Sequence, residues 1–235
     1  MSMKIGIVGG LSPESTVTYY LHLTRRYAQL FGGSTAPEIV IYSVNLEAYH
    51  QYRNQGRWDL VTDDLVKAIH HLEGCGVDVA LISTNTMHKV FAEVQARCTV
   101  KLLSIIDATI AAIQAQGLRK VGLLGTRFTM VDDFFTKALT RHGLDPVTPN
   151  AEEVAMIHRI IEDELVKGIF TEASRAQYLA VIQRLIGEGA EGIILGCTEI
   201  PLLIQQQHVP VPVFDTATLH AEAVLQYVLP HHTPV

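Results

Sequence analysis

Short apolar runs alternate with longer amphipathic segments along the whole chain. The runs are rich in Val, Ile and Leu and end at Gly, Ser, Thr or Asn, a pattern typical of buried strands. Between them, apolar residues recur at helical spacing, as in Val61, Leu65, Ile69 and Leu72. Strands that alternate with helices in this way predict βαβ units and a parallel sheet. The predicted strands are 4–8, 38–44, 77–82, 101–106, 120–124, 192–195 and 211–214, with a short extended piece in 143–149.

Local signals set the ends of several predicted helices. Ser12 can cap a helix whose first position is Pro13, and Gly32 follows its last residue. Segment 174–177 reads as a capping box for a later helix. The predicted helices are about 15–31, a short one within 46–58, 61–72, 87–96, 107–116, 131–142, 154–168, 174–187, 201–207 and 217–228.

The pattern restarts near the middle of the chain. Segment 4–10 resembles 120–126, and 106–109 resembles 214–217. Thr84 and Cys197 lie at corresponding strand ends of the two halves. We therefore predict an α/β fold of two pseudo-symmetric domains, each a parallel sheet flanked by helices. Because ligands of open α/β sheets bind beyond the carboxyl ends of the strands, we expect the active site in the cleft between the domains.

Composition narrows the class of protein. The chain is 48% hydrophobic and 18% charged, with a net charge of −6 and no basic cluster, which argues against nucleic acid as a partner. No apolar segment approaches the roughly 18 residues needed to cross a bilayer, so no membrane association is expected. The start of the chain lacks the features of a signal peptide. Three cysteines without metal-ligand spacing predict a reducing compartment, and we expect a soluble, cytoplasmic protein without a metal site.

Cys197 is the first candidate for chemistry. It follows Gly196 at a strand end and precedes a predicted helix, where backbone N–H groups and the helix dipole favour a thiolate. The alternative is a buried cysteine that acts as a small hydrophobic residue. For Cys75 and Cys98, a structural role is the simpler interpretation.

The second candidate is the segment Thr84-Asn85-Thr86. Its hydroxyls, amide and backbone N–H groups can bind a carboxylate, although the same residues could simply cap the next helix. His88 could tune this site or be a structural histidine. Arg53 and Lys167 are candidates for a second carboxylate, with a solvated loop charge and a helix C-terminal cation as the alternatives. The Gly9-Gly10 turn lacks the spacing and the acidic residue of a dinucleotide site.

Five segments together resemble the aspartate/glutamate racemase superfamily, specifically its amino-acid racemases that work without pyridoxal phosphate. The resemblance covers the whole chain and rests on 6–16, 85–88, 125–126, 172–175 and 196–199. It implies a small-molecule amino-acid substrate, no cofactor and a homodimer. It also implies that the last strand and helix return to the first domain, which gives domains of 1–106 plus 210–235 and of 107–209.

The resemblance assigns roles to particular residues. Members of the family carry a cysteine at both strand ends, and one removes the α-proton while the other delivers a proton to the opposite face. The corresponding catalytic residues here are Thr84 and Cys197. Glu199 stands where glutamate racemases of the cell-wall type have histidine, which favours the aspartate branch. The residues implied in substrate binding are Leu11, Arg53, Asn85, Thr86, Thr126, Lys167, Thr198 and Glu199.

Thr84 is the departure from the family pattern, because a hydroxyl is a far weaker base than a thiolate at neutral pH. Three consequences are open: Thr84 relays a proton and the enzyme racemises with unequal forward and reverse rates, Cys197 alone drives a one-sided reaction, or activity is lost. The prediction is a cofactor-independent racemase of aspartate, glutamate or both, with an asymmetric Thr/Cys pair. The alternatives are a single-cysteine decarboxylase or isomerase of the same superfamily, and a non-catalytic dicarboxylate-binding protein.

Overall fold

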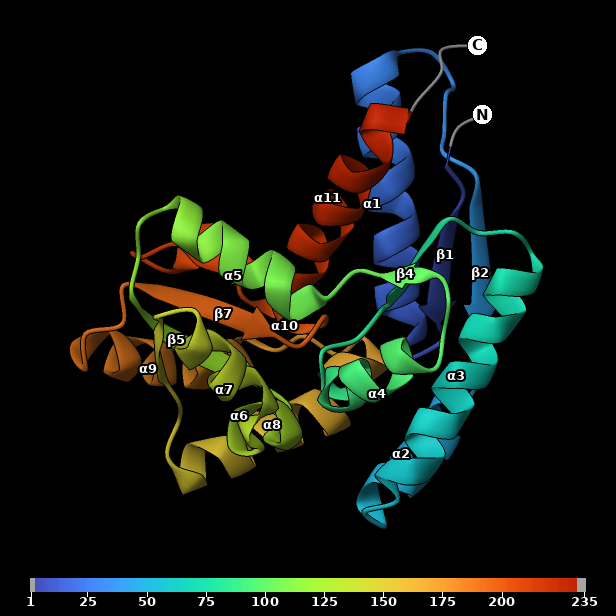
Figure 1. Cartoon of the computed structure of the whole chain (residues 1–235). Coiled ribbons are helices and arrows are strands. Elements are labelled where there is room, and N and C mark those ends of the chain that lie inside the picture. The colour runs from blue at the N-terminus through green and yellow to red at the C-terminus, as the bar shows by residue number, and fades with distance from the viewer. Residues whose placement is uncertain (1–2, 232–235) are drawn as a thin grey trace. The chain divides into compact units, whose positions relative to one another are not determined.

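A computed structural model describes residues 3–231 and divides the chain into two compact units. One unit contains the residues up to Ile105 together with those from His220 onward, and the other contains Ile106–Leu219. Each unit has one four-stranded parallel sheet flanked by helices (Figure 1). The predicted α/β class with two parallel sheets is therefore confirmed. Within the described residues, no helix has both the length and the hydrophobicity needed to cross a membrane.

The sheet of the first unit has the strand order β2-β1-β3-β4. Its strands are β1 (Ile5–Gly9), β2 (Ile39–Ser43), β3 (Val79–Ile82) and β4 (Lys101–Leu102). The helices that begin in this part of the chain are α1 (Pro13–Phe31), α2 (Leu46–Asn54), α3 (Trp58–Gly74), the 3-10 helix η1 (Thr86–Val90), α4 (Phe91–Ala96) and α5 (Ile105–Ala115). After the second unit, α11 (Thr216–Val228) and η4 (Leu229–His231) complete the described chain. Figure 1 shows α11 alongside α1, and a hydrogen bond between Tyr19 and His220 joins the two helices.

The sheet of the second unit repeats this arrangement, with the order β6-β5-β7-β8. Its strands are β5 (Lys120–Gly125), β6 (Asp145–Val147), β7 (Gly192–Gly196) and β8 (Val213–Asp215). Its helices are α6 (Arg127–Val131), α7 (Asp133–Arg141), α8 (Ala151–Asp163), η2 (Leu165–Lys167), α9 (Glu172–Gly187), α10 (Ile200–Leu203) and η3 (Gln206–His208). By position in the sheet, β5 corresponds to β1 and β7 corresponds to β3, as the sequence repeat predicted.

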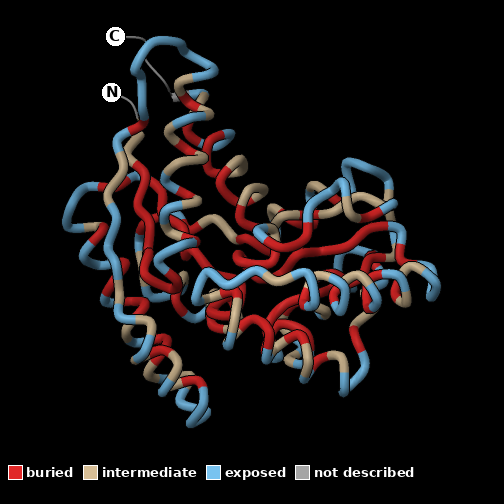
Figure 2. Tube along the Cα trace, turned by 180° about the vertical axis from the view of Figure 1, so that it is seen from behind, coloured by how far each residue is buried: buried red, intermediate tan, exposed pale blue. Residues whose placement is uncertain are grey.

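The central strands are buried on both faces (Figure 2). In the first unit, Val8, Ala80 and Ile82 join a hydrophobic cluster with α2 and α3. Ile5 and Ile7 alternate with them and are fully buried on the opposite face. Such continuous apolar runs are typical of a parallel sheet covered by helices on both sides.

The turn from β1 into α1 forms as its sequence predicts. Ser12 is the N-cap, and its hydroxyl accepts a hydrogen bond from the Ser15 backbone N–H at 3.2 Å. Gly10 has a φ of 78°, and a Cβ there would lie 2.3 Å from the Val44 carbonyl oxygen. Only glycine fits this close approach, so the turn depends on Gly10.

The structure corrects the domain assignment of the last strand. The expected first domain includes segment 210–235, but β8 pairs with β7 through Ile193↔Val213 and its neighbours. The strand therefore belongs to the second sheet, and the return to the first unit occurs within α11, at His220. A strand of three residues is stable here because it extends an existing sheet, and its own sequence could not indicate which sheet that would be.

Other boundaries also differ from the prediction. The predicted strand 101–106 ends at Leu102, because Ile105 already begins α5. Segment 174–177 is not a capping box, since the N-cap of α9 is Thr171. The Ser174 hydroxyl instead donates to the Glu164 carboxylate at 2.5 Å. At the starts of α5 and α9, the prediction of a helix is therefore correct, but the predicted first residue is wrong.

Candidate functional site

Thr84, Asn85 and Thr86 lie directly beyond the carboxyl end of β3, next to the end of β1. Ser83 fixes this position, because its backbone N–H and its hydroxyl both donate to the Val8 carbonyl, at 3.1 and 2.9 Å. The Ser15 hydroxyl of α1 donates in turn to the Ser83 carbonyl at 3.1 Å. The start of the candidate site is therefore held from both β1 and α1.

All three residues of this segment are buried, with 2–8% of their surface exposed. Asn85 stands at the start of η1, yet its side chain makes no capping hydrogen bond. The alternative role of Asn85 as an ordinary helix cap is therefore not realised. Buried hydroxyl and amide groups at a strand end are suited to binding a polar ligand.

Two other candidates of the first unit lie in different surroundings. The Leu11 side chain is 6% exposed and packs in the cluster with Val8 and Tyr49, so only its backbone is suited to binding a substrate. Arg53 is not a solvated loop charge, because it lies in α2 and is 7% exposed. A buried guanidinium favours nearby negative groups, as a carboxylate-binding residue would.

His88 is buried, and its hydrogen bonds define its tautomer. Its Nδ1 is 2.7 Å from the Thr84 carbonyl oxygen and therefore carries the hydrogen, while its Nε2 accepts from the Ile105 backbone N–H at 3.0 Å. Nearby, Nε2 of His220 donates to the Leu103 carbonyl at 2.8 Å, and its Nδ1 accepts from the Tyr19 hydroxyl at 2.9 Å. Burial lowers the pKa of His88 to about 3 and that of His220 to about 4.

These two histidines predict a loss of stability in mild acid. Unfolded histidine binds a proton as the pH falls through about 6.5, whereas both folded rings stay neutral until the pH nears 4. The unfolded state therefore binds more protons in this window, and the free energy of unfolding falls as the pH falls. At pH 5 the two rings together lower it by about 4 kcal/mol relative to pH 7.5. Urea unfolding at the two pH values measures the difference.

The matched variants for this test are His220→Gln and His142→Gln. His142 is exposed, so its replacement is expected to leave the pH dependence of the urea midpoint unchanged. Replacement of His220 is expected to remove about half of the effect of the buried pair. Equal pH dependence in the wild type and in His220→Gln would contradict the assignment of the acid sensitivity to these rings.

In the second unit, Thr126 and Cys197 follow the neighbouring strands β5 and β7. Gly125 pairs with Gly196, and a Cβ on either would lie 2.7 Å from a carbonyl oxygen of the other strand. Because both positions are glycine, the two strand ends approach closely and bring Thr126 and Cys197 together. The Thr126 hydroxyl caps α6 by accepting from the Thr129 backbone N–H at 3.4 Å.

The surroundings of Cys197 favour the protonated thiol over the thiolate. Its Sγ donates a hydrogen bond to Glu199 Oε2 at 2.9 Å, and the Thr198 hydroxyl donates to the same oxygen at 2.9 Å. Burial, followed by the negative charge of Glu199, raises the pKa of Cys197 well above its usual value. The prediction relied on a helix dipole, but α10 has only four residues, too few for a large dipole.

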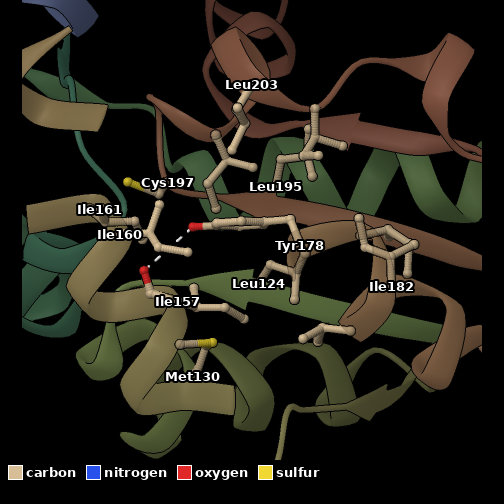
Figure 3. Close-up of a cluster of buried hydrophobic side chains, with 14 of the residues drawn as sticks. Leu124, Met130, Ile157, Ile160, Ile161, Tyr178, Ile182, Leu195, Cys197 and Leu203 are labelled. Atoms are coloured by element: carbon tan, nitrogen blue, oxygen red, sulfur yellow. Dashed lines mark hydrogen bonds between the residues drawn. The ribbon is translucent and has the colours of Figure 1, made fainter. Parts of the chain in front are cut away.

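The Cys197 side chain lies against a large hydrophobic cluster that contains Tyr178, Ile160 and Ile161 (Figure 3). The Tyr178 hydroxyl donates to the Ile157 carbonyl at 3.5 Å. Burial raises the Tyr178 pKa well above its usual value, so its hydroxyl stays protonated. The cluster therefore excludes water from one side of the thiol, and Glu199 is its polar partner.

Lys167 is the least enclosed of the candidate residues. Its side chain is 59% exposed, and its Nζ lies 3.8 Å from the Asp163 carboxylate, a surface pair of small energetic value. It ends η2, as expected for a helix C-terminal cation. Because η2 packs against α10, Lys167 remains in the same region of the unit as Thr198 and Glu199.

The candidate residues thus form two groups, one in each unit. Leu11 and the segment 84–86 lie at the strand ends of the first, and Thr126 and the segment 197–199 lie at those of the second. Among the described residues, no group of three His, Cys, Asp or Glu side chains is placed to hold a metal ion. His220 was not identified from the sequence, because a histidine within an apolar helix gives no sign of its distant partners.

Comparisons with known proteins identify the family to which the chain belongs. The family model described as Asp/Glu/hydantoin racemase matches residues 8–224. The broad-specificity amino-acid racemase RacX of Bacillus subtilis is 25% identical over 239 residues, which cover 97% of this chain and 100% of RacX.

Two solved structures are similar over almost their whole length. A protein of Yersinia pestis proposed to be an Asp/Glu racemase has a TM-score of 0.90 and 41% identity, over 97% of this chain and 99% of that one. An aspartate racemase homologue of Pyrococcus horikoshii has a TM-score of 0.82 and 39% identity, over 96% and 99%. With its repeated sheets and paired strand-end groups, the chain belongs to the Asp/Glu/hydantoin racemase family.

Proposed function

We propose that this protein is a cofactor-independent racemase of aspartate, glutamate or both, with Thr84 and Cys197 as the proton-transferring pair. The observation that carries the proposal is their topological equivalence. Thr84 follows β3 in the order β2-β1-β3-β4, and Cys197 follows β7 in the order β6-β5-β7-β8. Each of the two repeated sheets thus has one of the two candidate side chains after the corresponding strand. Inversion at a carbon needs such groups on opposite faces, because a single base tends to return the proton to the face from which it came.

The two groups differ in strength as acids and bases. A thiol whose pKa is raised, as at Cys197, is a strong base once it has lost its proton. Thr84 has only a hydroxyl and must pass its proton to or from water or a neighbouring group. We therefore infer that Cys197 is the principal acid and base, and that Thr84 is the weaker partner.

The residues around the pair are suited to an amino-acid carboxylate. Removal of an α-proton leaves negative charge on that carboxylate, so several donors must stabilise it. Asn85 and Thr86 supply donors beside Thr84, and Thr126 and Thr198 supply donors beside Cys197. All four are buried, which strengthens their hydrogen bonds to a charged ligand.

Arg53 and Lys167 are proposed to bind the side-chain carboxylate of the substrate. The buried Arg53 favours an anion, whereas Lys167 is exposed and only weakly paired with Asp163. The name of the Pyrococcus protein supports aspartate, and RacX is named for broad specificity. The buried cation Arg53 supports acidic substrates as the preferred class.

A substrate panel tests the proposal directly. Purified protein is incubated with each enantiomer of aspartate, glutamate, alanine, serine and lysine in D₂O, and chiral chromatography with mass spectrometry measures inversion and deuterium uptake. We expect inversion of aspartate or glutamate, at least about tenfold faster than that of the neutral and basic amino acids. The reaction is expected to proceed without added pyridoxal phosphate.

Other outcomes of the panel would contradict the proposal in different ways. Similar rates with all the amino acids would replace the acidic substrate class with a broad one. Release of carbon dioxide from a malonate-type acid, with no exchange on any amino acid, would indicate a decarboxylase. Tight binding of aspartate without inversion or exchange would indicate a binding protein.

A further inference from the structure

A chain of hydrogen bonds links Thr84 to residues far away in the sequence. The Thr84 carbonyl accepts from His88 Nδ1, and His88 Nε2 accepts from the Ile105 backbone N–H, at 2.7 and 3.0 Å. Two residues before Ile105, the Leu103 carbonyl accepts from His220 Nε2 at 2.8 Å. The two imidazole rings are in edge-to-face contact, with centroids 5.8 Å apart. Every ring nitrogen in this pair has a partner, so both rings are fixed in orientation.

This histidine pair lies at the two places where the chain passes from one unit to the other. The chain leaves the first unit after Ile105 and re-enters it at His220. His88 therefore holds the last residue before the first crossing, and His220 is the first residue after the second. The Tyr19 hydroxyl, which donates to His220 Nδ1 at 2.9 Å, ties the pair to α1. Phe91 stacks on the His88 ring, with centroids 5.0 Å apart, and keeps it in place.

We propose that His88 is a positioning residue for Thr84, which it joins to the point where the chain leaves the first unit. The proposal rests on the role of Thr84 in the proposed function. Ser83 is fixed by Val8 and Ser15, so the Thr84 carbonyl is the next point at which the segment needs a partner. His88 supplies that partner from four residues further along, while its other nitrogen is held by Ile105. The position of Thr84 thus depends on the Nδ1 bond of this ring to its carbonyl, while the Nε2 bond to Ile105 helps to orient the ring.

Replacing His88 by asparagine or by glutamine tests its hydrogen bonds to Thr84 and to Ile105 one at a time. In His88→Asn the side-chain amide takes the place of Nδ1 and can still donate a hydrogen bond to the Thr84 carbonyl. In His88→Gln the amide takes the place of Nε2, so it can keep only the hydrogen bond with Ile105. His142→Gln, on the surface, is the matched control. Hydrogen–deuterium exchange of the backbone amides of 84–87 reports the position of the segment without any need for activity. In D₂O, inversion and deuterium uptake with retained configuration report proton transfer at the two faces separately.

For His88→Gln we expect amide exchange in 84–87 to be about tenfold faster and inversion about tenfold slower. Deuterium uptake with retention, which needs only Cys197, is expected to stay within about twofold of the wild type, because that residue is not affected. His88→Asn is expected to keep the slow amide exchange of the wild type and most of its rate of inversion. A purely structural role would instead reduce inversion and uptake with retention together.

The proposal is overturned if His88→Gln leaves amide exchange and inversion as in the wild type. It is also overturned if His88→Asn and His88→Gln are equally impaired, or if both kinds of proton transfer fall together. Failure of the proposed function is a different result, in which the wild type itself inverts no amino acid. In that case the amide-exchange comparison of the two variants still decides whether His88 holds the Thr84 segment.

Discussion

Racemisation is expected to fall by at least about 10³-fold when Cys197 is replaced by alanine, because the stronger of the two proton-transferring groups is lost. The effect should be the same from either enantiomer. The two enantiomers have equal free energy in solution, so kcat/KM must be equal in both directions for any variant. The unequal strengths of Thr84 and Cys197 can therefore appear only in kcat and KM taken separately, and in proton exchange without inversion. Chiral chromatography and deuterium uptake measure these quantities.

Thr84→Ala is the complementary variant. It leaves Cys197 in place, so one enantiomer is expected to exchange its α-proton for deuterium with retained configuration while inversion is lost. Thr84→Cys is expected to raise inversion and to bring the kcat values of the two directions closer together, since a thiol replaces a hydroxyl. Cys98→Ala removes a half-buried thiol of the other unit and is the matched control.

Two results would contradict this assignment. Wild-type inversion in Cys197→Ala would show that the thiol is not the principal base. Loss of all proton exchange in Thr84→Ala, with the fold intact by circular dichroism, would show that Cys197 cannot act alone. Each outcome identifies which half of the proposed pair is wrong.

The fold was largely predictable because a parallel sheet leaves a strong trace in the sequence. Strands covered on both faces are apolar throughout, as β3 and β7 are, and each ends at small or polar residues. Because segment 4–10 resembles segment 120–126, the sequence predicted that β1 and β5 are equivalent strands. The placement of β8 was not predictable, since its three residues carry no information about which sheet they extend.

The strand-end positions of the candidate residues were predictable, whereas their surroundings were less so. Strand ends collect functional residues in this class of fold, so Thr84 and Cys197 were identified from local sequence and the repeat. The protonation of Cys197 depends on how deeply it is buried and on the direction of the Glu199 side chain, neither of which a sequence pattern contains. The partners of His88 and His220 depend on chain crossings that are distant in the sequence.

Glu199 influences the protonation of the Cys197 thiol. Its Oε2 accepts from both Cys197 Sγ and the Thr198 hydroxyl, and its charge helps to hold the proton on sulfur. The backbone N–H of Glu199 also donates to Sγ and lowers the pKa of the thiol, but burial and the Glu199 carboxylate outweigh it. When Cys197 acts as a base it must first lose this proton in a site that the hydrophobic cluster shields from water. We infer that Glu199 takes up the proton, so that thiol and carboxylate act as one unit.

Glu199→Gln is therefore expected to make the Cys197 thiol easier to alkylate and, at the same time, to slow racemisation. Loss of the negative charge lowers the pKa of Cys197, so alkylation by iodoacetamide should begin at lower pH than in the wild type. Racemisation should nevertheless fall by about 10²-fold, because an amide cannot take up the proton that the thiol must release. Rates of alkylation against pH, measured beside chiral assays of the same samples, separate the two effects. If racemisation rose together with alkylation, Glu199 would act only to suppress the thiolate, and the proton would have to leave Cys197 by another route.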